Sequence, residues 1–450
     1  MIPYIPHTDA DRRHMLEAIG LASMDDLFSD IPQEVLYRGD LEIDPGLSEE
    51  EVLNRLRSLA AMNRIGTCFL GMGCYDRIIP STVKSLASLP SFVTAYTPYQ
   101  PEISQGLLQA IFEFQSMVCS LTGMDVANAS LYDGPTAAAE AAAMMLASKR
   151  KSTTVLVSET VHPFTIQVLQ TWALGTGFVI RIVPERTCVA DVELIGSSLA
   201  PHVAGVVVQS PNRYGYLEDY SGLAERVHGT GSLLTISSDP LSLVLQRSQA
   251  EWGADIAIGD MQPLGLPTAF GGPSCGYMAV REPLMRKIPG RIVGQTVDIE
   301  GKRAYTLTLQ AREQHIKRER ATSNICSNQA LAALTATIHI TLVGYNGMLE
   351  AAALSRDKAA YLARLLEKHK SLSVGKAAPF WCEFPVVFRD ASQMEQVLTA
   401  LKSRDIHGGV RLGALTGRAE DEATLIVAVT EKRTREELDT YAHVVEEVLG

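Results

Sequence analysis

Residues 131–140 combine a Gly-Pro turn with the start of an Ala-rich segment, and this combination could bind an anion. A helix that begins near Gly134 and Thr136 would present free N–H groups and the positive end of its dipole. Asp133 stands just before it and would repel a doubly charged phosphate. An ordinary capped helix with no ligand explains the same residues equally well, so both interpretations stay open.

The glycine pattern does not support nucleotide chemistry. Gly71 and Gly73 supply two of the three glycines of a dinucleotide fingerprint, but Asp76 occupies the third position, where its charge would repel a pyrophosphate. No G-x-x-x-x-G-K-[ST] loop for a nucleoside triphosphate is present either. A nicotinamide enzyme and a nucleotide hydrolase are therefore disfavoured.

Gln262 follows an apolar run and precedes a loop rich in glycine and proline. This placement resembles that of the Schiff-base lysine in fold-type I pyridoxal-phosphate enzymes. A glutamine amide cannot replace that amine, because its nitrogen lone pair is delocalised. No lysine occurs anywhere between Lys151 and Lys287. The chain therefore has the expected arrangement for the cofactor but lacks the essential nucleophile.

Charge and composition exclude several other classes of protein. The 450 residues carry a net charge of −11, which disfavours non-specific nucleic-acid binding. No apolar run approaches the roughly 20 residues that span a bilayer, and residues 1–7 lack the pattern of a secretion signal. Seven scattered cysteines without a C-x-x-C pair indicate reduced thiols and a cytoplasmic protein, and no His/Cys spacing predicts a metal site.

Short apolar runs rich in β-branched residues alternate with longer polar or amphipathic segments after residue 151. The runs lie at residues 154–157, 178–183, 205–208, 233–236, 255–258 and 276–280. The segments long enough for a helix lie at residues 163–174, 190–199, 222–228 and 241–250. This alternation predicts a mostly parallel sheet covered on both faces. Because no helix-length segment precedes the last run, one antiparallel strand is expected.

The flanking regions have other patterns. Helices are expected near residues 9–20 and from residue 48 onward, and long helices at residues 329–342 and 348–368. The remainder, residues 380–449, indicates strand–helix–strand–strand–helix. The predicted organisation is an N-terminal helical extension (1–65), a large α/β domain (66–325) and a small C-terminal α+β domain (326–450).

Four motifs give the chain a close resemblance to the glycine decarboxylase P-protein family. They are Gly71-Met72-Gly73, YTPYQPEISQG at 96–106, TGMDVANAS at 122–130 and REQHIKRERATSNIC at 312–326. The run at 96–106 is highly specific. The resemblance covers nearly the whole chain. It falls in the N-terminal half of the long single-chain form, which corresponds to the alpha subunit, or subunit 1, of the split bacterial form.

The resemblance implies an α/β fold-type I scaffold with a mostly parallel sheet and a small C-terminal domain. In this family glycine loses its carboxylate as CO2, and the aminomethyl group passes to the lipoyl arm of the H-protein. The pyridoxal phosphate is expected to be bound covalently by a lysine-bearing beta subunit, in an α2β2 heterotetramer. Gln262 at the lysine position fits the alpha subunit and excludes the beta subunit.

The resemblance also assigns candidate residues around this position. His162 resembles the histidine that stacks on the cofactor ring, and Asp239 resembles the aspartate that pairs with the pyridine nitrogen. Together with Gly134 and Thr136, they would be remnants of a cofactor site in a chain without the lysine. For His162, a residue that merely starts a helix is the alternative.

Fold-type I sites lie at subunit interfaces, so this chain is expected to complete the site of its partner. Neutral hydroxyl and amide donors suit the glycine carboxylate because they hold it without over-stabilising it before it departs. The residues expected at the edge of that site are Tyr96, Tyr99, Gln100, Glu102, Ser104, Gln105, Arg312 and His315. A rigid interface loop, or simple contact with the partner subunit, would explain the same residues.

Two other functions remain open from the residues alone. The chain could be a stand-alone pyridoxal-phosphate lyase or transferase that uses a distant lysine such as Lys287 or Lys302. It could instead be a non-catalytic scaffold subunit that has lost its site.

Overall fold

The computed structural model describes residues 6–450, so the start of the segment used for the secretion expectation lies outside the described residues. Two compact units divide the chain, with the boundary between Arg64 and Ile65. The first contains α1 (Asp9–Ala18) and α2 (Glu49–Ala61), which begin at side-chain caps close to the expected positions. No residue in 6–64 is buried.

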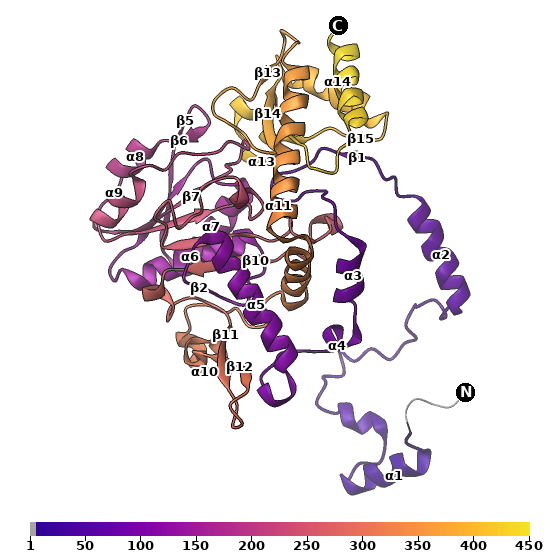
Figure 1. Ribbon diagram of the computed structural model, residues 1–450. Helices are drawn as coiled ribbons and strands as arrows, with labels where there is room; N and C mark the ends of the chain where they lie inside the picture. Colours follow the sequence, from indigo (N-terminus) through magenta and orange to yellow (C-terminus); the bar gives the residue numbers. More distant parts are fainter. Residues whose placement is uncertain (1–5) are drawn as a thin grey trace. The chain divides into compact units, whose positions relative to one another are not determined.

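A seven-stranded sheet forms the centre of the second unit, in the order β2-β10-β9-β8-β7-β3-β4. Figure 1 labels its strands β2, β7 and β10. Its strands are β2 (Val126–Ala127), β3 (Thr154–Ser158), β4 (Val179–Val183), β7 (Val203–Gln209), β8 (Leu233–Ser237), β9 (Ile256–Asp260) and β10 (Gly276–Val280). Neighbouring strands pair in parallel except at β10, which is antiparallel to both β9 and β2. The six predicted strands, including the antiparallel one, are confirmed.

Apolar clusters cover both faces of this sheet, as its continuous β-branched strands require. One face packs against α6 (Gly134–Ser148) and α7 (Pro163–Thr176). The other face packs against α5 (Gln105–Thr122), α8 (Val192–Ser197), α9 (Leu223–Gly229) and the first half of α11 (Ala330–Leu366).

The helix expected at residues 241–250 is wrong. Only a single 3-10 turn forms there, at Ser242–Val244. The buried Gln249 amide donates to the carbonyls of Ile236 and Ile258 and to the Tyr277 hydroxyl. This side chain satisfies two neighbouring strand carbonyls, and the backbone around it forms turns instead of a helix.

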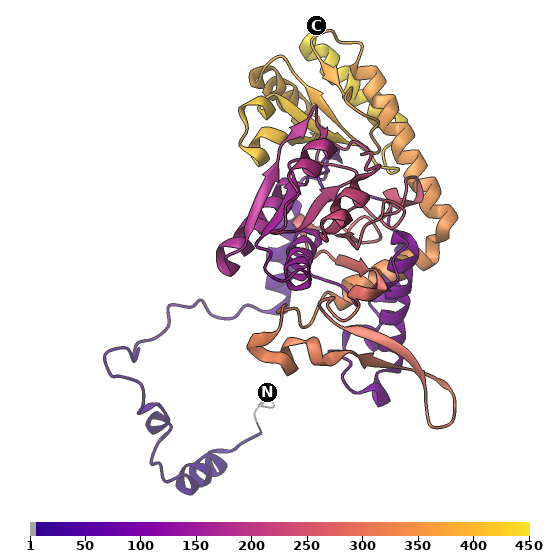
Figure 2. The ribbon, with the colours of Figure 1, turned by 90° about the vertical axis from the view of Figure 1, so that its left-hand side faces the viewer.

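The C-terminal part is an antiparallel four-stranded sheet with helices beside it (Figure 2). Its elements are β13 (Ser373–Val374), β14 (Glu383–Val387), α12 (Ala391–Lys402), β16 (Val410–Arg411), α13 (Leu412–Thr416), β17 (Thr424–Ala428) and α14 (Arg435–Leu449). The two long helices expected before it form one element, α11, which breaks at Gly344, where φ is 61°.

Several elements were not foreseen. The strands β11 (Ile292–Val297) and β12 (Arg303–Thr308) form a hairpin that packs on α5. Near the start of the unit, β1 (Thr67–Cys68) pairs in parallel with β15 (Ile406–His407), and the fully buried Phe69 belongs to the C-terminal core. The remaining short elements are α3 (Ser81–Ala87), α4 (Pro90–Val93), β5 (Glu185–Arg186), β6 (Val189–Ala190) and α10 (Gln314–Lys317).

Within residues 6–450, no helix is sufficiently long and apolar to cross a membrane. The same described residues contain no group of three or more His, Cys, Asp or Glu side chains placed to hold a metal ion. All seven cysteines are free thiols.

Candidate functional site

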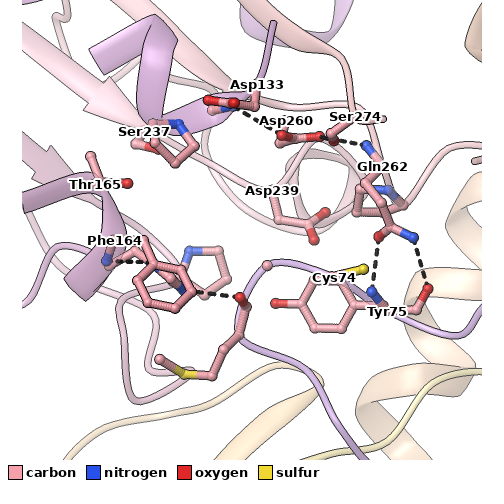
Figure 3. A pocket seen from close by; sticks show the side chains of 18 of the residues that line it. Cys74, Tyr75, Asp133, Phe164, Thr165, Ser237, Asp239, Asp260, Gln262 and Ser274 are labelled. Atoms are coloured by element: carbon pink, nitrogen blue, oxygen red, sulfur yellow. Dashed lines mark hydrogen bonds between the residues drawn. The ribbon is translucent and has the colours of Figure 1, made fainter. Parts of the chain in front are cut away.

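A cavity of about 350 Å3 lies at the carboxyl ends of β7, β8 and β9, where open α/β sheets bind their ligands. Its wall includes the start of α6, the start of α7, the segment 72–75 and β14. Four of the predicted residues line it: Gly134, His162, Asp239 and Gln262. Figure 3 shows Asp239 and Gln262 among the side chains that line the cavity.

Gln262 is 4% exposed, and both polar atoms of its amide are hydrogen-bonded. Its Oε1 accepts from the backbone N–H of Tyr75 at 2.9 Å, and its Nε2 donates to the carbonyls of Tyr75 and Leu266 at 3.0 and 3.1 Å. The residue at the lysine position thus holds the segment 72–75 against the cavity (Figure 3). Both N–H donors of the amide are therefore used by backbone carbonyls, and its oxygen already accepts one hydrogen bond.

His162 caps α7 and contacts the same segment. Its Nδ1 accepts from the Phe164 N–H at 3.1 Å, so the ring proton is on Nε2, which donates to the Met72 carbonyl at 2.9 Å. Burial lowers the pKa of His162 to about 4, so the ring is neutral at pH 7. His162 therefore starts a helix and also lines the cavity, and its role in stacking on a cofactor ring stays a prediction.

The free N–H groups at the start of α6 donate to carboxylates of the chain itself. The Thr136 N–H donates to Asp133 Oδ1 at 2.7 Å, and the Gly134 N–H donates to Asp260 Oδ2 at 2.9 Å. Ser274 also donates to Asp260. Thr136 itself does not line the cavity. These two carboxylates occupy the donors that a phosphate would need.

Two further acids face the cavity. Asp239 Oδ1 accepts from the Leu241 N–H at 2.8 Å, whereas its buried Oδ2 has no partner among the described residues. Glu383 accepts from the Met72 N–H and, at 2.9 Å, from the Tyr75 hydroxyl. Burial raises the pKa of Asp239 to about 6 and that of Glu383 to about 7.

These residues do not fit pyridoxal phosphate. The cavity offers no amine, because Gln262 stands at the lysine position and no lysine lines the wall. A phosphate bound at the start of α6 would lie beside the carboxylates of Asp133 and Asp260. Four acidic side chains in all line the cavity. The one cation in the wall, Arg213, is paired with Glu185 at 3.2 Å. The cavity therefore lacks the groups that would hold the cofactor.

The loop at residues 96–105 lies elsewhere and does not line the cavity. Tyr96 is 83% and Tyr99 46% exposed, and Gln100 and Glu102 are exposed as well. Ser104 begins α5 without a side-chain cap bond. The Gln105 amide is used structurally: it donates to Tyr305 O at 2.9 Å and accepts from Tyr305 N at 2.8 Å.

Arg312 and His315 lie on the segment after β12. Arg312 lines a second cavity of about 200 Å3 together with Arg286, Lys287 and Lys317. Its Nη1 donates to the Ile288 carbonyl, while Nε and Nη2 lack partners in the described chain. His315 packs edge-on against Tyr99 with ring centroids 5.7 Å apart. The predicted edge residues thus form one group around Tyr99 and a neighbouring one around Arg312.

Several residues of these sites were missed in the sequence. Glu383 and Tyr75 hold the segment 72–75 in place, and Arg291 donates to the Tyr99 hydroxyl at 3.4 Å. Residues 272–276 also match the spacing G-x-S-x-G, a signal that was available. Ser274 in that match precedes a strand and donates to Asp260, so it lacks the strand–turn–helix setting of a nucleophile.

Comparison with known proteins gives consistent matches over nearly the whole chain. A sequence profile of the glycine cleavage system P-protein matches residues 3–445. A probable glycine dehydrogenase (decarboxylating) subunit 1 from Geobacillus kaustophilus is 49% identical over 444 residues, which cover 98% of each chain. A similar protein from Bacillus cereus is 48% identical over 440 residues, with 97% of each chain covered.

Solved structures agree with these matches. The crystal structure of an inhibitor-bound glycine decarboxylase (P-protein) of the glycine cleavage system superposes with a TM-score of 0.90 at 40% identity, covering 100% of both chains. A sphingosine-1-phosphate lyase from Burkholderia pseudomallei matches in fold, with a TM-score of 0.67 at 15% identity over 91% of this chain and 93% of that chain. The expected α/β fold-type I architecture with its mostly parallel sheet is confirmed.

Proposed function

The chain belongs to the glycine cleavage system P-protein family, and on this premise we propose that it is the alpha subunit of a two-subunit glycine decarboxylase. With a lysine-bearing beta subunit it would decarboxylate glycine, release CO2 and pass the aminomethyl group to the lipoyl arm of the H-protein. The observation that carries this proposal is Gln262, whose amide is spent on backbone groups at the position of the missing lysine.

Pyridoxal phosphate, when bound to an enzyme of this class, withdraws the electrons left behind when glycine loses its carboxylate. We place the cofactor in the beta subunit, because the cavity of this chain has no amine and has acids where a phosphate would bind. His162, Asp239, Gly134 and Thr136 are then remnants whose present contacts are internal.

The contribution of this chain would be the edge of the partner's site. Tyr96 and Tyr99 are exposed aromatic residues on a loop fixed by two prolines, and such a loop loses little entropy when a partner covers it. Gln100 and Glu102 project from the same loop, while Ser104 and Gln105 begin α5 behind it. Arg312 and His315 extend this surface after β12.

The proposed assembly is an α2β2 heterotetramer in the cytoplasm that binds the lipoylated H-protein. Neither lysine considered for a stand-alone enzyme lines the 350 Å3 cavity. Lys287 borders the smaller one, and the exposed Lys302 is paired with Glu300 at 2.5 Å. Both positions argue against a stand-alone reaction in this chain.

The test is co-expression with a lysine-bearing paralogue, followed by assay of the exchange between the glycine carboxyl group and labelled bicarbonate. The complex should exchange, whereas the isolated chain should neither exchange nor give a stoichiometric borohydride-reduced adduct with pyridoxal phosphate above the background labelling of its lysines. Turnover by the isolated chain would support the stand-alone enzyme instead.

A scaffold role is tested in the same complex. The double variant Tyr99→Phe with Gln100→Ala should lower the exchange rate, whereas Tyr345→Phe, at an exposed tyrosine of α11, should not. An unchanged rate in the double variant would leave this chain as a scaffold.

A further inference from the structure

Arg291 differs from the other deeply buried arginines of the chain. Arg77, Arg213, Arg291 and Arg433 are each at most 6% exposed. Three of them have a carboxylate close by, at 2.7 Å for Arg77, 3.2 Å for Arg213 and 3.0 Å for Arg433. Within residues 6–450, Arg291 makes no ion pair, although only 2% of it is exposed.

Only neutral groups surround this guanidinium. Its Nη1 donates to Asn328 Oδ1 at 3.3 Å, and its Nη2 donates to Thr97 Oγ1 at 3.2 Å, to the Tyr99 hydroxyl at 3.4 Å and to Cys326 Sγ at 3.9 Å. The guanidinium carbon lies 5.3 Å from the centre of the Tyr99 ring, and Nε has no partner in the described chain.

A buried charge without a counter-charge is unfavourable, and an arginine cannot escape that cost by losing its proton. The chain supplies no acid here: the Glu313 carboxylate faces His315 Nδ1 at 3.8 Å and does not contact Arg291. The complementary anion must therefore come from outside this chain. Tyr99 is 46% exposed and Cys326 is exposed, so the cluster opens to the surface.

The hydrogen-bond directions indicate how an anion would be held. Because Arg291 donates to the oxygens of Thr97 and Tyr99, the hydroxyl protons of both residues must point away from it. Donation from a charged group also polarises the two hydroxyls and makes them stronger donors. The result is two outward donors backed by a buried positive charge.

We propose that Thr97 and Tyr99, backed by Arg291, form an oxyanion subsite that binds the carboxylate or phosphate group of a small molecule held by the second subunit. The inference rests on the proposed function, which supplies two such groups, the carboxylate of glycine and the phosphate of the cofactor. Arg291 is a positioning residue, because it acts on the anion through two hydroxyls.

The test uses the co-expressed complex with Arg291→Gln, Arg291→Lys or Thr97→Val in this chain, and Arg303→Gln as control. Arg303 is an exposed arginine on β12. The KM and kcat for glycine are measured in the exchange assay, and the Kd for pyridoxal phosphate is measured by titrating the cofactor-free complex. Subunit assembly is followed by size-exclusion chromatography.

Arg291→Gln should raise one of the two constants by at least about tenfold, in line with loss of a charge-assisted contact. Arg291→Lys should fall between wild type and Gln, because it keeps the charge but not the two-pronged contact. Thr97→Val should shift the same constant by less, and Arg303→Gln should shift neither. A raised KM with unchanged Kd assigns the subsite to the glycine carboxylate, and a raised Kd assigns it to the phosphate.

The proposal is overturned if the assembled Arg291→Gln complex keeps both constants within about twofold of wild type. That outcome would mean that an acid of the partner neutralises Arg291. If Arg291→Gln fails to assemble, Thr97→Val and Tyr99→Phe decide, and two unchanged variants refute the subsite. An inactive wild-type complex would instead refute the proposed function.

Discussion

At the scale of single residues, hydrogen bonds around the cavity hold the segment 72–75 in place. Gln262 fixes the backbone of Tyr75, Glu383 binds the amide of Met72, and His162 donates to the Met72 carbonyl. Three elements distant in sequence thus hold one short segment. Gly71 takes part as well, because a Cβ there would lie 1.9 Å from Glu383 Oε1.

Restoring an amine at position 262 should not restore cofactor binding. Gln262→Lys alone should give no borohydride-reduced adduct with pyridoxal phosphate above the wild-type background, because Asp133 and Asp260 still occupy the donors at the start of α6. The triple variant with Asp133→Asn and Asp260→Asn removes both charges, and Asn preserves the helix cap. An adduct should form only in the triple variant, as measured by intact-protein mass spectrometry.

The outcome that would contradict this prediction is full labelling of the single variant. It would show that the two carboxylates are no barrier and that the missing amine is the only defect of the site. Wild type provides the background labelling at the other lysines.

Glu383 should make the protein less stable as pH rises. Burial raises its pKa to about 7 from an ordinary value of 4.5, so the native state holds a proton that the unfolded state loses between these values. At low pH the carboxyl is protonated in both states and its ionisation does not affect the free energy of unfolding. As pH rises, this ionisation lowers the free energy of unfolding, by about 3 kcal/mol in total above pH 7. Glu383→Gln should therefore flatten the fall in Tm between pH 5 and 8.

The control for this measurement is Glu446→Gln, at an exposed position of α14, which should leave the pH dependence unchanged. Glu140 and Glu218 contribute in the same direction, because burial raises the pKa of each to about 7. Some pH dependence should thus persist in the variant. An identical pH profile in wild type and Glu383→Gln would contradict the prediction.

Local patterns could identify Gln262, His162 and Asp239, because each stands at a strand end or a helix start that the sequence marks. They could not identify Arg291 or Glu383. The importance of Glu383 comes from Met72 and Tyr75, more than 300 positions away in the chain. Arg291 is important because it is buried without a carboxylate partner, and this can be recognised only when all of its neighbours are known.

At the scale of elements, continuous apolar strands were predictable because a sheet covered on both faces needs apolar residues at every position. The hairpin β11–β12 was not, since half of the residues of β11 are exposed and the strand carries little apolar signal. The helix at residues 241–250 failed for a tertiary reason, the demand of two strand carbonyls for the Gln249 amide.

The break in α11 should depend on Gly344. Its φ of 61° and ψ of −176° fall in a region that only glycine occupies easily, although a Cβ there would meet no atom within 4 Å. Gly344→Ala should thus destabilise the chain by about 1–3 kcal/mol through backbone strain alone. The measurement is the denaturant midpoint at constant m-value.

Gly175→Ala in α7 is the matched control. A Cβ at this glycine also meets nothing within 4 Å, and its φ is not positive, so alanine should stabilise by up to about 1 kcal/mol. Equal effects of the two substitutions would show that conformation at residue 344 is not what keeps the helix broken.

At the scale of the whole molecule, stability should reside in residues 65–450. The described part of the first unit, residues 6–64, buries no side chain. Removal of residues 1–64 from the isolated chain should therefore change Tm by no more than about 2 °C. Differential scanning calorimetry of both chains measures this. A drop well beyond that range would show that the first unit contributes to the folded core.

The strand pair β1–β15 joins the start of the second unit to the C-terminal sheet region, so the core there is complete only when both strands have been made. Thr67 pairs with Ile406, so during synthesis β1 has no partner strand until residues 406–407 have been made. Until then Phe69 has no apolar neighbours from that domain, and the edge of β1 stays open to other chains. A gene split after residue 325 would place the two strands on separate chains. The C-terminal fragment would then lack Phe69 in its core, and β15 would have no partner strand.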